Sequence, residues 1–263
     1  MTARPPDVQP YTRAFYEHQS GGSRQSAAET IPLLLQWMRV SSVVDVGCGI
    51  GTWLAVFREH GITDAVGLDG AHVDRNQLLI PASQFRSVDL AHPPPPARTF
   101  DLAVSIEVGE HLPATAADNF VRYLTTLAPI VLFSAAVPGQ GGTNHVNEQW
   151  PEYWAARFVE YGFVTIDCLR PLLWHRERVL WWHAQNMLLF VEQRSLEGHP
   201  VLQEMAARTD FRCLARVHPR AYAQAREETR ELRERLRPEN MSARQLLRRL
   251  PAALLGAVRR RLR

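Results

Sequence analysis

The sequence predicts a doubly wound α/β fold, in which a parallel sheet is covered by helices on both faces. Short apolar runs alternate with helical stretches across residues 24–195. The first of these runs ends directly in a glycine-rich loop, and no run approaches the roughly 20 residues needed to span a bilayer. Strands that alternate with helices imply parallel pairing, so both faces of the sheet should be buried.

The elements of the first half follow from periodicity and turn residues. Residues 24–39 predict a helix with Ile31, Leu34, Leu35 and Met38 on one face. Residues 41–46 are β-branched and end in glycines, which indicates a buried strand. A helix is expected at 52–60, and strands are expected at 65–68, 83–88 and 100–106.

The second half continues the alternation. An amphipathic helix is expected at 114–127 and another helix at 149–161. Strands are expected at 129–135, 163–167 and 186–192. Further helical stretches follow at about 199–207 and 219–236, and a last basic stretch runs from 242 to 263.

Composition divides the chain into three parts. Residues 1–23 are polar and rich in proline and glycine, which predicts a flexible arm; residues 24–195 form the ligand-binding domain, and residues 196–263 a helical, arginine-rich extension. The net charge of +3 combines −6 over residues 1–215 with +9 over residues 216–263. All 30 basic residues are arginine, so lysine chemistry is excluded.

The three cysteines are far apart and predict neither a disulfide framework nor a zinc knuckle. The N-terminus has no apolar segment typical of a secretory signal. A cytoplasmic protein is therefore expected.

The strongest motif is the glycine loop after the first strand. Gly47, Gly49 and Gly51 would let the backbone turn tightly and let a nucleotide-type ligand lie against it. Thr52 stands where the dinucleotide fingerprint requires glycine, and the Asp45 carboxylate would repel a pyrophosphate but suit a cationic ligand. The pattern favours S-adenosylmethionine (SAM) over NAD.

Two later carboxylates complete this expectation. Asp69 ends the second strand, where it could accept both ribose hydroxyls, and Asp89 follows the third, where it could accept from the adenine amino group while Leu90 packs on the ring. Turn carboxylates with only structural roles are the alternative. The expected cofactor-binding residues are Asp45, Gly47, Gly49, Gly51, Asp69, Gly70, Asp89, Leu90 and Glu107.

Through these motifs residues 24–192 resemble a class I SAM-dependent methyltransferase. The matching stretches are Val43–Gly51, Gly67–Gly70, Ser87–Leu90 and Phe100–Leu102. The resemblance implies a seven-stranded Rossmann-like sheet with an antiparallel last strand, and SAM bound across the first strands.

An acid–histidine group follows the fourth strand. Glu107, Glu110 and His111 would share one face if the chain turns helical there, and His145 in the next loop lies at the same edge of the sheet. These four residues could hold a divalent ion such as Mg²⁺, Mn²⁺ or Zn²⁺. The pattern is similar to metal-dependent 2′-O-methyltransferases of small RNAs and to O-methyltransferases of ubiquinone biosynthesis, which implies that a metal activates a hydroxyl.

Two alternatives remain open beside metal binding. In one, His111 or His145 is a metal-free general base, while Glu110 caps the helix or contacts the cofactor; in the other, the group is structural. The expected catalytic residues are His111, His145 and Glu110.

Residues near the expected pocket indicate the substrate. Trp150, Tyr153 and Trp154, and later Trp174, His175, Trp181 and Trp182, could stack on a flat ring or a sugar, and Arg170, Arg176 and Arg178 could hold an anion. Packing of a long insertion is the alternative. The stretch 133–154 resembles a bacterial methyltransferase subgroup of glycan and natural-product pathways, which implies a small hydroxylated substrate.

The basic stretch at 242–263 could lie on an anionic membrane, contact a second subunit, or remain unstructured. It lacks aromatic residues for stacking on bases, so nucleic acid is an unlikely partner. The predicted function is O-methylation of a small hydroxylated molecule. The rivals are ribose 2′-O-methylation of RNA and a non-catalytic SAM-binding regulatory module.

Overall fold

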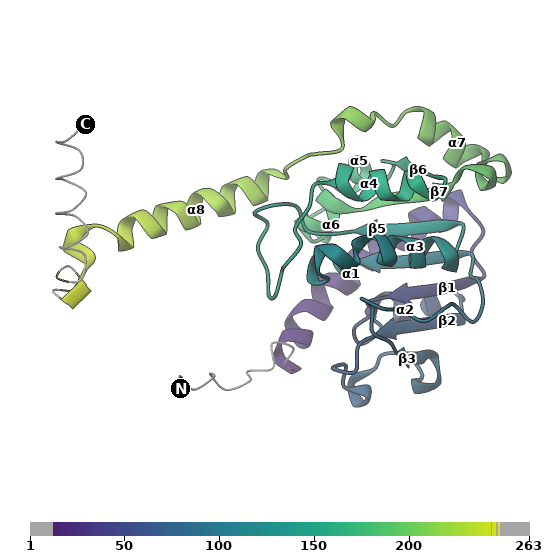
Figure 1. The fold of residues 1–263 in the computed structure, drawn as a ribbon, viewed down its shortest axis with the longest axis horizontal. Helices are drawn as coiled ribbons and strands as arrows, with labels where there is room; N and C mark the ends of the chain where they lie inside the picture. Colours follow the sequence, from purple (N-terminus) through teal and green to yellow (C-terminus); the bar gives the residue numbers. More distant parts are fainter. Residues whose placement is uncertain (1–12, 243, 246, 248–263) are drawn as a thin grey trace. The chain divides into compact units, whose positions relative to one another are not determined.

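The structure is a computed structural model that describes residues 13–242, 244, 245 and 247. The chain divides into two compact units, Met1–His218 and Pro219–Arg263. The first unit contains a seven-stranded sheet in the order β3-β2-β1-β4-β5-β7-β6 (Figure 1). The strands are β1 (Ser42–Val46), β2 (Asp64–Asp69), β3 (Phe85–Ser87), β4 (Leu102–Ile106), β5 (Ile130–Ser134), β6 (Phe163–Ile166) and β7 (Leu188–Glu192).

The pairing of the strands explains their sequences. β1, β2, β3, β4 and β5 pair in parallel, whereas β7 is antiparallel to both β5 and β6. Every residue of β5 is buried, and so are the last four of β1, because helices cover both faces. The doubly wound fold and its antiparallel last strand are confirmed.

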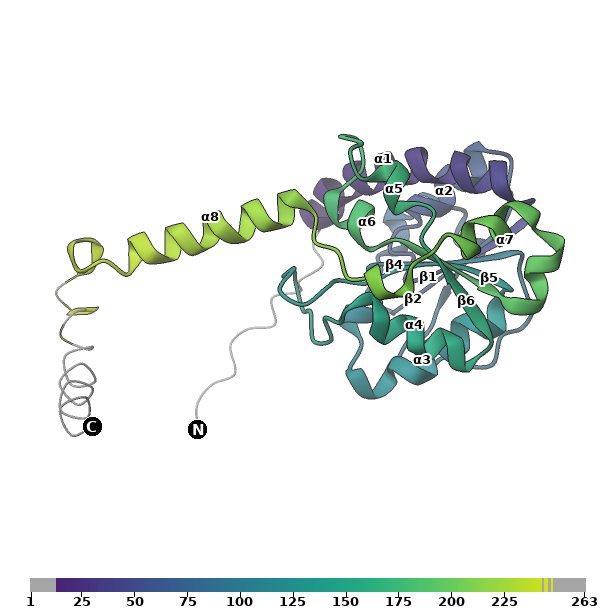
Figure 2. The ribbon, with the colours of Figure 1, turned by 90° about the horizontal axis from the view of Figure 1, so that it is seen from above.

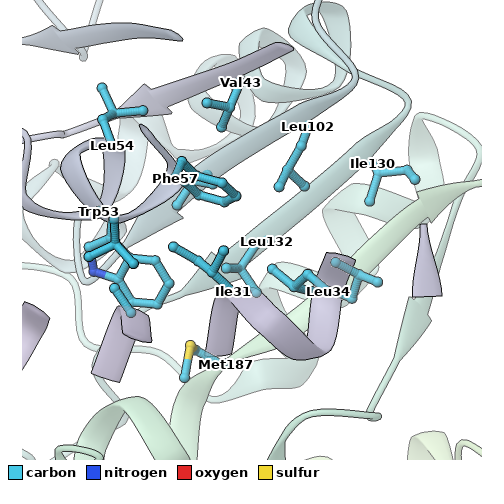
Figure 3. Packing of buried hydrophobic residues seen from close by; sticks show 14 of the residues in the cluster. Ile31, Leu34, Val43, Trp53, Leu54, Phe57, Leu102, Ile130, Leu132 and Met187 are labelled. Atoms are coloured by element: carbon cyan, nitrogen blue, oxygen red, sulfur yellow. The ribbon is translucent and has the colours of Figure 1, made fainter. Parts of the chain in front are cut away.

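Helices on the two faces of the sheet enclose separate apolar clusters. α1 (Arg13–Trp37), α2 (Thr52–Glu59), α5 (Arg170–Leu173) and α6 (Trp181–Asn186) lie on one face, with α3 (Ala117–Leu127) and α4 (Pro151–Glu160) on the other (Figure 2). Figure 3 shows the first cluster, in which side chains of α1 and α2 pack on those of β1, β4 and β5. In the second cluster Phe120, Trp154 and Phe158 pack against the opposite face.

Two elements differ from the sequence prediction. α1 begins at Arg13 rather than at residue 24, so part of the expected flexible arm is helical. The segment before β7 forms α6 up to Asn186, and the strand expected from residue 186 begins at Leu188. Both differences arise because the prediction used only neighbouring residues. The glycine pair Gly21-Gly22, which lies within α1, had indicated a break before residue 24.

The first unit extends to His218, beyond residue 195, where we expected the domain to end. After α7 (Pro200–Ala207), Leu214 is buried against the second apolar cluster. Its carbonyl accepts a hydrogen bond of 2.7 Å from Arg170, whose guanidinium also pairs with Asp167. These contacts fix the segment to the sheet domain.

The second unit begins with α8 (Pro219–Arg235), which has no buried residue. Its charges pair along the helix, for example Arg230 with Glu227 and Arg235 with Glu231, as in helices that face solvent on all sides. Most of the basic stretch at 242–263 lies outside the described residues. None of the described helices is both long enough and apolar enough to cross a membrane.

Candidate active site

The glycine loop after β1 adopts a conformation that L side chains rarely take. Gly47, Gly49 and Gly51 have φ angles of 85°, 53° and 85°. A Cβ on Gly47 would lie 2.2 Å from a methyl group of Val108, and a Cβ on Gly51 would lie 2.9 Å from Ile80. Glycine is therefore required at both positions for steric as well as conformational reasons.

Asp69 holds this loop in place. Its Oδ2 accepts a hydrogen bond of 2.6 Å from the Gly49 N–H, and its Oδ1 accepts one of 2.6 Å from the Gly70 N–H. Burial raises the pKa of Asp69, while the two backbone bonds oppose that shift. Asp69 therefore joins β2 to the loop and presents its carboxylate at the edge of the cavity described next.

A cavity of about 420 Å³ opens at the carboxyl ends of β1, β2 and β4. Eighteen of the twenty residues that line it come from four segments: the end of β1 with the glycine loop and the start of α2, the end of β2 with the turn that follows, the turn after β3, and the end of β4 with the turn that follows. The other two, Ser23 and His183, come from α1 and α6. Eight of the nine predicted cofactor-binding residues line the cavity, and Gly51 does not. The eight are Asp45, Gly47, Gly49, Asp69, Gly70, Asp89, Leu90 and Glu107.

Asp45 is the most deeply placed acid of the cavity. It is 3% exposed, and burial, with a smaller contribution from Asp69, raises the pKa of its carboxyl to about 8. A carboxyl group in this setting is neutral at pH 7 until a cation lies beside it. Asp45 is therefore suited to a positively charged ligand, as its place beneath the loop predicted.

Asp89 lies at the rim and is exposed, whereas Leu90 is buried against the second apolar cluster. The Asp89 carboxylate accepts a hydrogen bond of 2.9 Å from the Ala91 N–H and lies 3.1 Å from Nδ1 of His92. These bonds hold the pKa of Asp89 below its usual value, so the carboxylate is ionised at the mouth of the cavity.

Glu107 takes a different position from the one predicted. Its φ of 56° places the backbone in the left-handed region, so it does not continue into the short helical turn Gly109–His111. Its carboxylate accepts hydrogen bonds of 2.9 Å from Gln140 Nε2 and 3.1 Å from Asn186 Nδ2. The predicted single helical face of Glu107, Glu110 and His111 is therefore absent, because Glu107 is left-handed and the helical turn begins only at Gly109.

The other three members of the acid–histidine group come together. One ligand atom from each of Glu110, His111 and His145 lies within 4.8 Å of the others. The two imidazole rings are 4.9 Å apart between centroids and meet edge to face. Glu107 is not part of this cluster, and His111 is the member that lines the cavity.

Glu110 is fully buried, and neither of its carboxylate oxygens has a hydrogen-bond partner. Burial first, and the nearby Glu107 second, raise the pKa of Glu110 well above its usual value. An unpartnered buried carboxyl is costly, so this position is explained best by a ligand or a proton that the group holds.

His145 is fixed by the loop that carries it. Its Nδ1 lies 2.9 Å from Oε1 of Glu148, whose carboxylate also accepts from the backbone N–H groups of Gly139 and Gly141. The Val146 and Asn147 N–H groups donate to the Glu110 carbonyl at 2.9 and 3.0 Å. The loop after β5 is thereby tied to the turn after β4.

The arginines expected to hold an anion are engaged elsewhere. Arg170 is fully buried and pairs with Asp167 through two nitrogens, at 2.8 and 2.7 Å. Arg176 and Arg178 both pair with Glu29. Arg170 therefore has a structural role, and Arg176 and Arg178, which share one carboxylate, are not among the residues that line the cavity.

The aromatic residues also lie elsewhere than expected. Trp154 is buried and packs on Phe133, and Trp174 and Trp181 contact His218. Trp53 is the tryptophan that lines the cavity. Packing, the alternative, accounts for Trp154, Trp174 and Trp181, whereas Trp150 is exposed.

Sequence reasoning missed several polar residues of α6. His183, Gln185 and Asn186 are all buried, and Asn186 holds Glu107 as described above. The signal was present in the sequence, because three polar residues interrupt an apolar run just before a strand. Their hydrogen-bond partners, such as Glu107 and His218, come from distant segments, so the local sequence does not identify them.

Comparisons with known proteins agree with this geometry. Residues 16–177, more than half of the chain, match the family described as methyltransferase domain. No curated protein matches the sequence.

Three solved structures illustrate the likeness. An O-methyltransferase family protein from Burkholderia thailandensis is 15% identical, with a TM-score of 0.48, over 68% of this chain and 57% of that chain. The methyltransferase domain of a bacterial CtHen1 is 19% identical, with a TM-score of 0.47, over 64% and 98%. Magnesium protoporphyrin IX methyltransferase from Synechocystis PCC 6803, with bound SAH, is 16% identical, with a TM-score of 0.46, over 65% and 83%. This chain thus spans little more than half the length of the Burkholderia protein.

Proposed function

The chain belongs to the methyltransferase domain family. On this premise we propose that it is a SAM-dependent enzyme that methylates a hydroxyl oxygen of a small molecule such as a sugar or natural product. The observation that carries the proposal is the pair of histidines beside the cavity. His111 lines it at the end of β4, and His145 lies against His111. A hydroxyl is a weak nucleophile, so its methylation benefits from a base at this place.

In this proposal the aspartates of the cavity bind SAM, and His111 accepts the proton of the acceptor hydroxyl. Asp45, Asp69 and Asp89 would contact the cationic end, the ribose and the adenine of SAM, which supplies the methyl group as an electrophile. Burial first, and His145 second, lower the pKa of His111, so its imidazole is neutral at pH 7. His111 would take the hydroxyl proton while the new oxygen–carbon bond forms and the bond between the methyl carbon and the sulfonium sulfur of SAM breaks, which leaves S-adenosylhomocysteine.

Single substitutions test this role. We expect His111→Ala to lower kcat about a hundredfold or more, the usual contribution of a general base, with little change in SAM affinity. The measurement is transfer of labelled methyl groups from SAM to hydroxylated compounds, beside SAM titration by calorimetry. His60→Ala, an exposed histidine at the end of α2, is the control. Full turnover in both His111→Ala and His145→Ala would contradict the proposal.

A second candidate is metal-assisted O-methylation, favoured by the unpartnered Glu110 carboxyl near both imidazoles. One carboxylate and two histidines suit Zn²⁺ or Mn²⁺, with Glu110, His111 and His145 as ligands. The ion would acidify the acceptor hydroxyl. Metal analysis of the purified protein tests it: about one ion per chain, lost in Glu110→Gln, supports this version, and full activity in EDTA with no bound metal excludes it.

A further inference from the structure

His183 of α6 is a buried histidine that the proposed mechanism does not use. It is 4% exposed, its Nδ1 has no hydrogen-bond partner, and it lines the cavity. The neighbouring polar side chains on the same helix do have hydrogen-bond partners. Gln185 accepts from the His218 N–H at 2.7 Å, and Asn186 donates to Glu107. His183 therefore keeps hydrogen-bonding capacity for something that enters the cavity.

Ser23, Trp53 and His183 form one side of the cavity, which we call the α6 wall. The Trp53 and His183 rings are 6.0 Å apart between centroids, and Trp53 Nε1 donates a hydrogen bond of 3.1 Å to Ser23 Oγ. These residues come from α2, α6 and α1, three helices on the same face of the sheet (Figure 2). The hydrogen bond of Trp53 is satisfied, which leaves His183 as the wall's unpartnered polar group.

The α6 wall adjoins the half of the cavity where methyl transfer is proposed. Asn186, on the same helix as His183, binds the Glu107 carboxylate at the end of β4. The ribose and adenine positions, at Asp69 and Asp89, belong to β2 and the turn after β3, on the other side of β1 in the strand order. His183 is therefore placed toward the acceptor.

The charges that line the cavity limit what the acceptor can carry. Four lining residues are carboxylic acids and none is arginine, and the sequence contains no lysine. Arg170, Arg176 and Arg178 pair with other carboxylates, as shown above. A carboxylate or phosphate on the acceptor would lose water here without gaining a cation.

We propose that His183 is a specificity-determining residue that hydrogen-bonds an uncharged polar group of the acceptor, and that the acceptor is a neutral or amine-bearing hydroxylated molecule. This inference rests on the proposed O-methylation. Burial lowers the pKa of His183 to about 3, so its imidazole stays neutral and can both donate and accept. An anion on the acceptor would be disfavoured because no arginine lines the cavity to pair with it, and a phosphodiester backbone is disfavoured for the same reason.

Matched compounds test the charge preference in the intact enzyme. Each of two series keeps one hydroxylated ring and changes its charge from neutral to amine to acid. The first series is catechol, dopamine and 3,4-dihydroxybenzoate, and the second is methyl glucoside, glucosamine and glucuronate. We expect the neutral or amine member to be methylated with at least tenfold higher kcat/KM than the acid of its series. Equal or faster methylation of the acids would overturn the inference but leave O-methylation standing. Transfer only to nitrogen or carbon acceptors would instead overturn the proposed function.

Variants test His183 itself. We expect His183→Leu to raise the KM of the accepted compound about tenfold, with little change in kcat or in the affinity for SAM. His183→Gln, which keeps a neutral donor and acceptor, should restore part of the loss. His175→Leu, an exposed histidine of the same connection, is the control. An unchanged KM in His183→Leu, or in His183→Ala if the leucine variant does not fold, would contradict the role.

Discussion

Gly47 shows how one residue joins backbone geometry to ligand binding. Its left-handed φ admits glycine readily, and the space that a Cβ would need is filled by Val108. Gly61 has the same φ of 85° but no atom within 4 Å of the corresponding Cβ position. Comparing alanine at these two positions therefore separates the free-energy cost of the left-handed backbone from the cost of the steric clash with Val108.

We expect Gly47→Ala to reduce SAM affinity at least tenfold and to lower the free energy of unfolding more than Gly61→Ala does. The left-handed conformation alone costs about 1–2 kcal/mol for alanine, and only Gly47→Ala adds a clash. Urea unfolding and calorimetric titration with SAM measure both effects. Equal losses in the two variants would contradict the steric explanation.

Asp45 gives a prediction about protons. At pH 7, below its pKa of about 8, the Asp45 carboxyl of the ligand-free protein is protonated. A cationic ligand beside it stabilises the ionised form and lowers that pKa, so binding releases a proton. SAM titrations in buffers of different ionisation enthalpy should show this release at pH 7, and Asp45→Asn should diminish it. Net proton uptake that is the same in both proteins would contradict the prediction.

At the scale of elements, a buried ion pair connects the last two strands to the segment after α7. Arg170 bonds Asp167 and the carbonyls of Leu214 and Gln185, at 2.7 and 3.3 Å for the carbonyls. Arg216 also approaches Asp167, at 3.3 Å. The buried Asp167 and the two carbonyls depend on Arg170, so this one side chain links α5, α6 and residues 209–218.

We expect Arg170→Leu to lower the free energy of unfolding by about 3–5 kcal/mol, because Asp167 loses its two closest hydrogen bonds and the carbonyls of Leu214 and Gln185 lose a buried donor. Arg176→Leu is the matched control, since its pair with Glu29 is at the surface and should contribute about 1 kcal/mol or less. Chemical denaturation of both variants measures the difference. A similar decrease in the free energy of unfolding for both variants would contradict a stabilising role for the buried Arg170 pair.

The loops at the carboxyl edge of the sheet show how far sequence reasoning reached. The strand, the glycine loop and Asp69 lie within a short stretch, and local patterns predicted their joint position. Glu110, His111 and His145 were also predicted to meet, because consecutive parallel strands end at one edge. The helical face that Glu107 was predicted to share with Glu110 and His111 is absent, since its partners Gln140 and Asn186 come from segments far along the chain.

At the scale of the whole molecule, the boundary between the two units at His218 separates a sheet domain from a helix without buried residues. Residues 209–218 belong to the first unit through Leu214 and through the bond from the Ala215 N–H to Glu152, at 2.8 Å. The extension that we predicted from residue 196 is thus divided between the two units.

We expect a protein that ends at His218 to retain SAM affinity and a Tm close to that of the full chain, because its apolar clusters are intact. A protein that ends at Arg208 should unfold at a clearly lower temperature, since it lacks the partners of Arg170 and Glu152. Calorimetry of the two proteins provides the comparison. Loss of SAM binding on removal of residues 219–263 would contradict this division.

By itself the sequence determined the alternation of strands and helices, the glycine loop and the acids that follow the first strands. These depend on the backbone preferences and apolar periodicity of neighbouring residues, which a single stretch of chain contains. Only the tertiary structure decided that Arg170 is structural, that Glu107 turns toward Asn186, and that His183 reaches the cavity. Each of these depends on which distant side chain supplies the partner, and packing of the whole chain sets that choice.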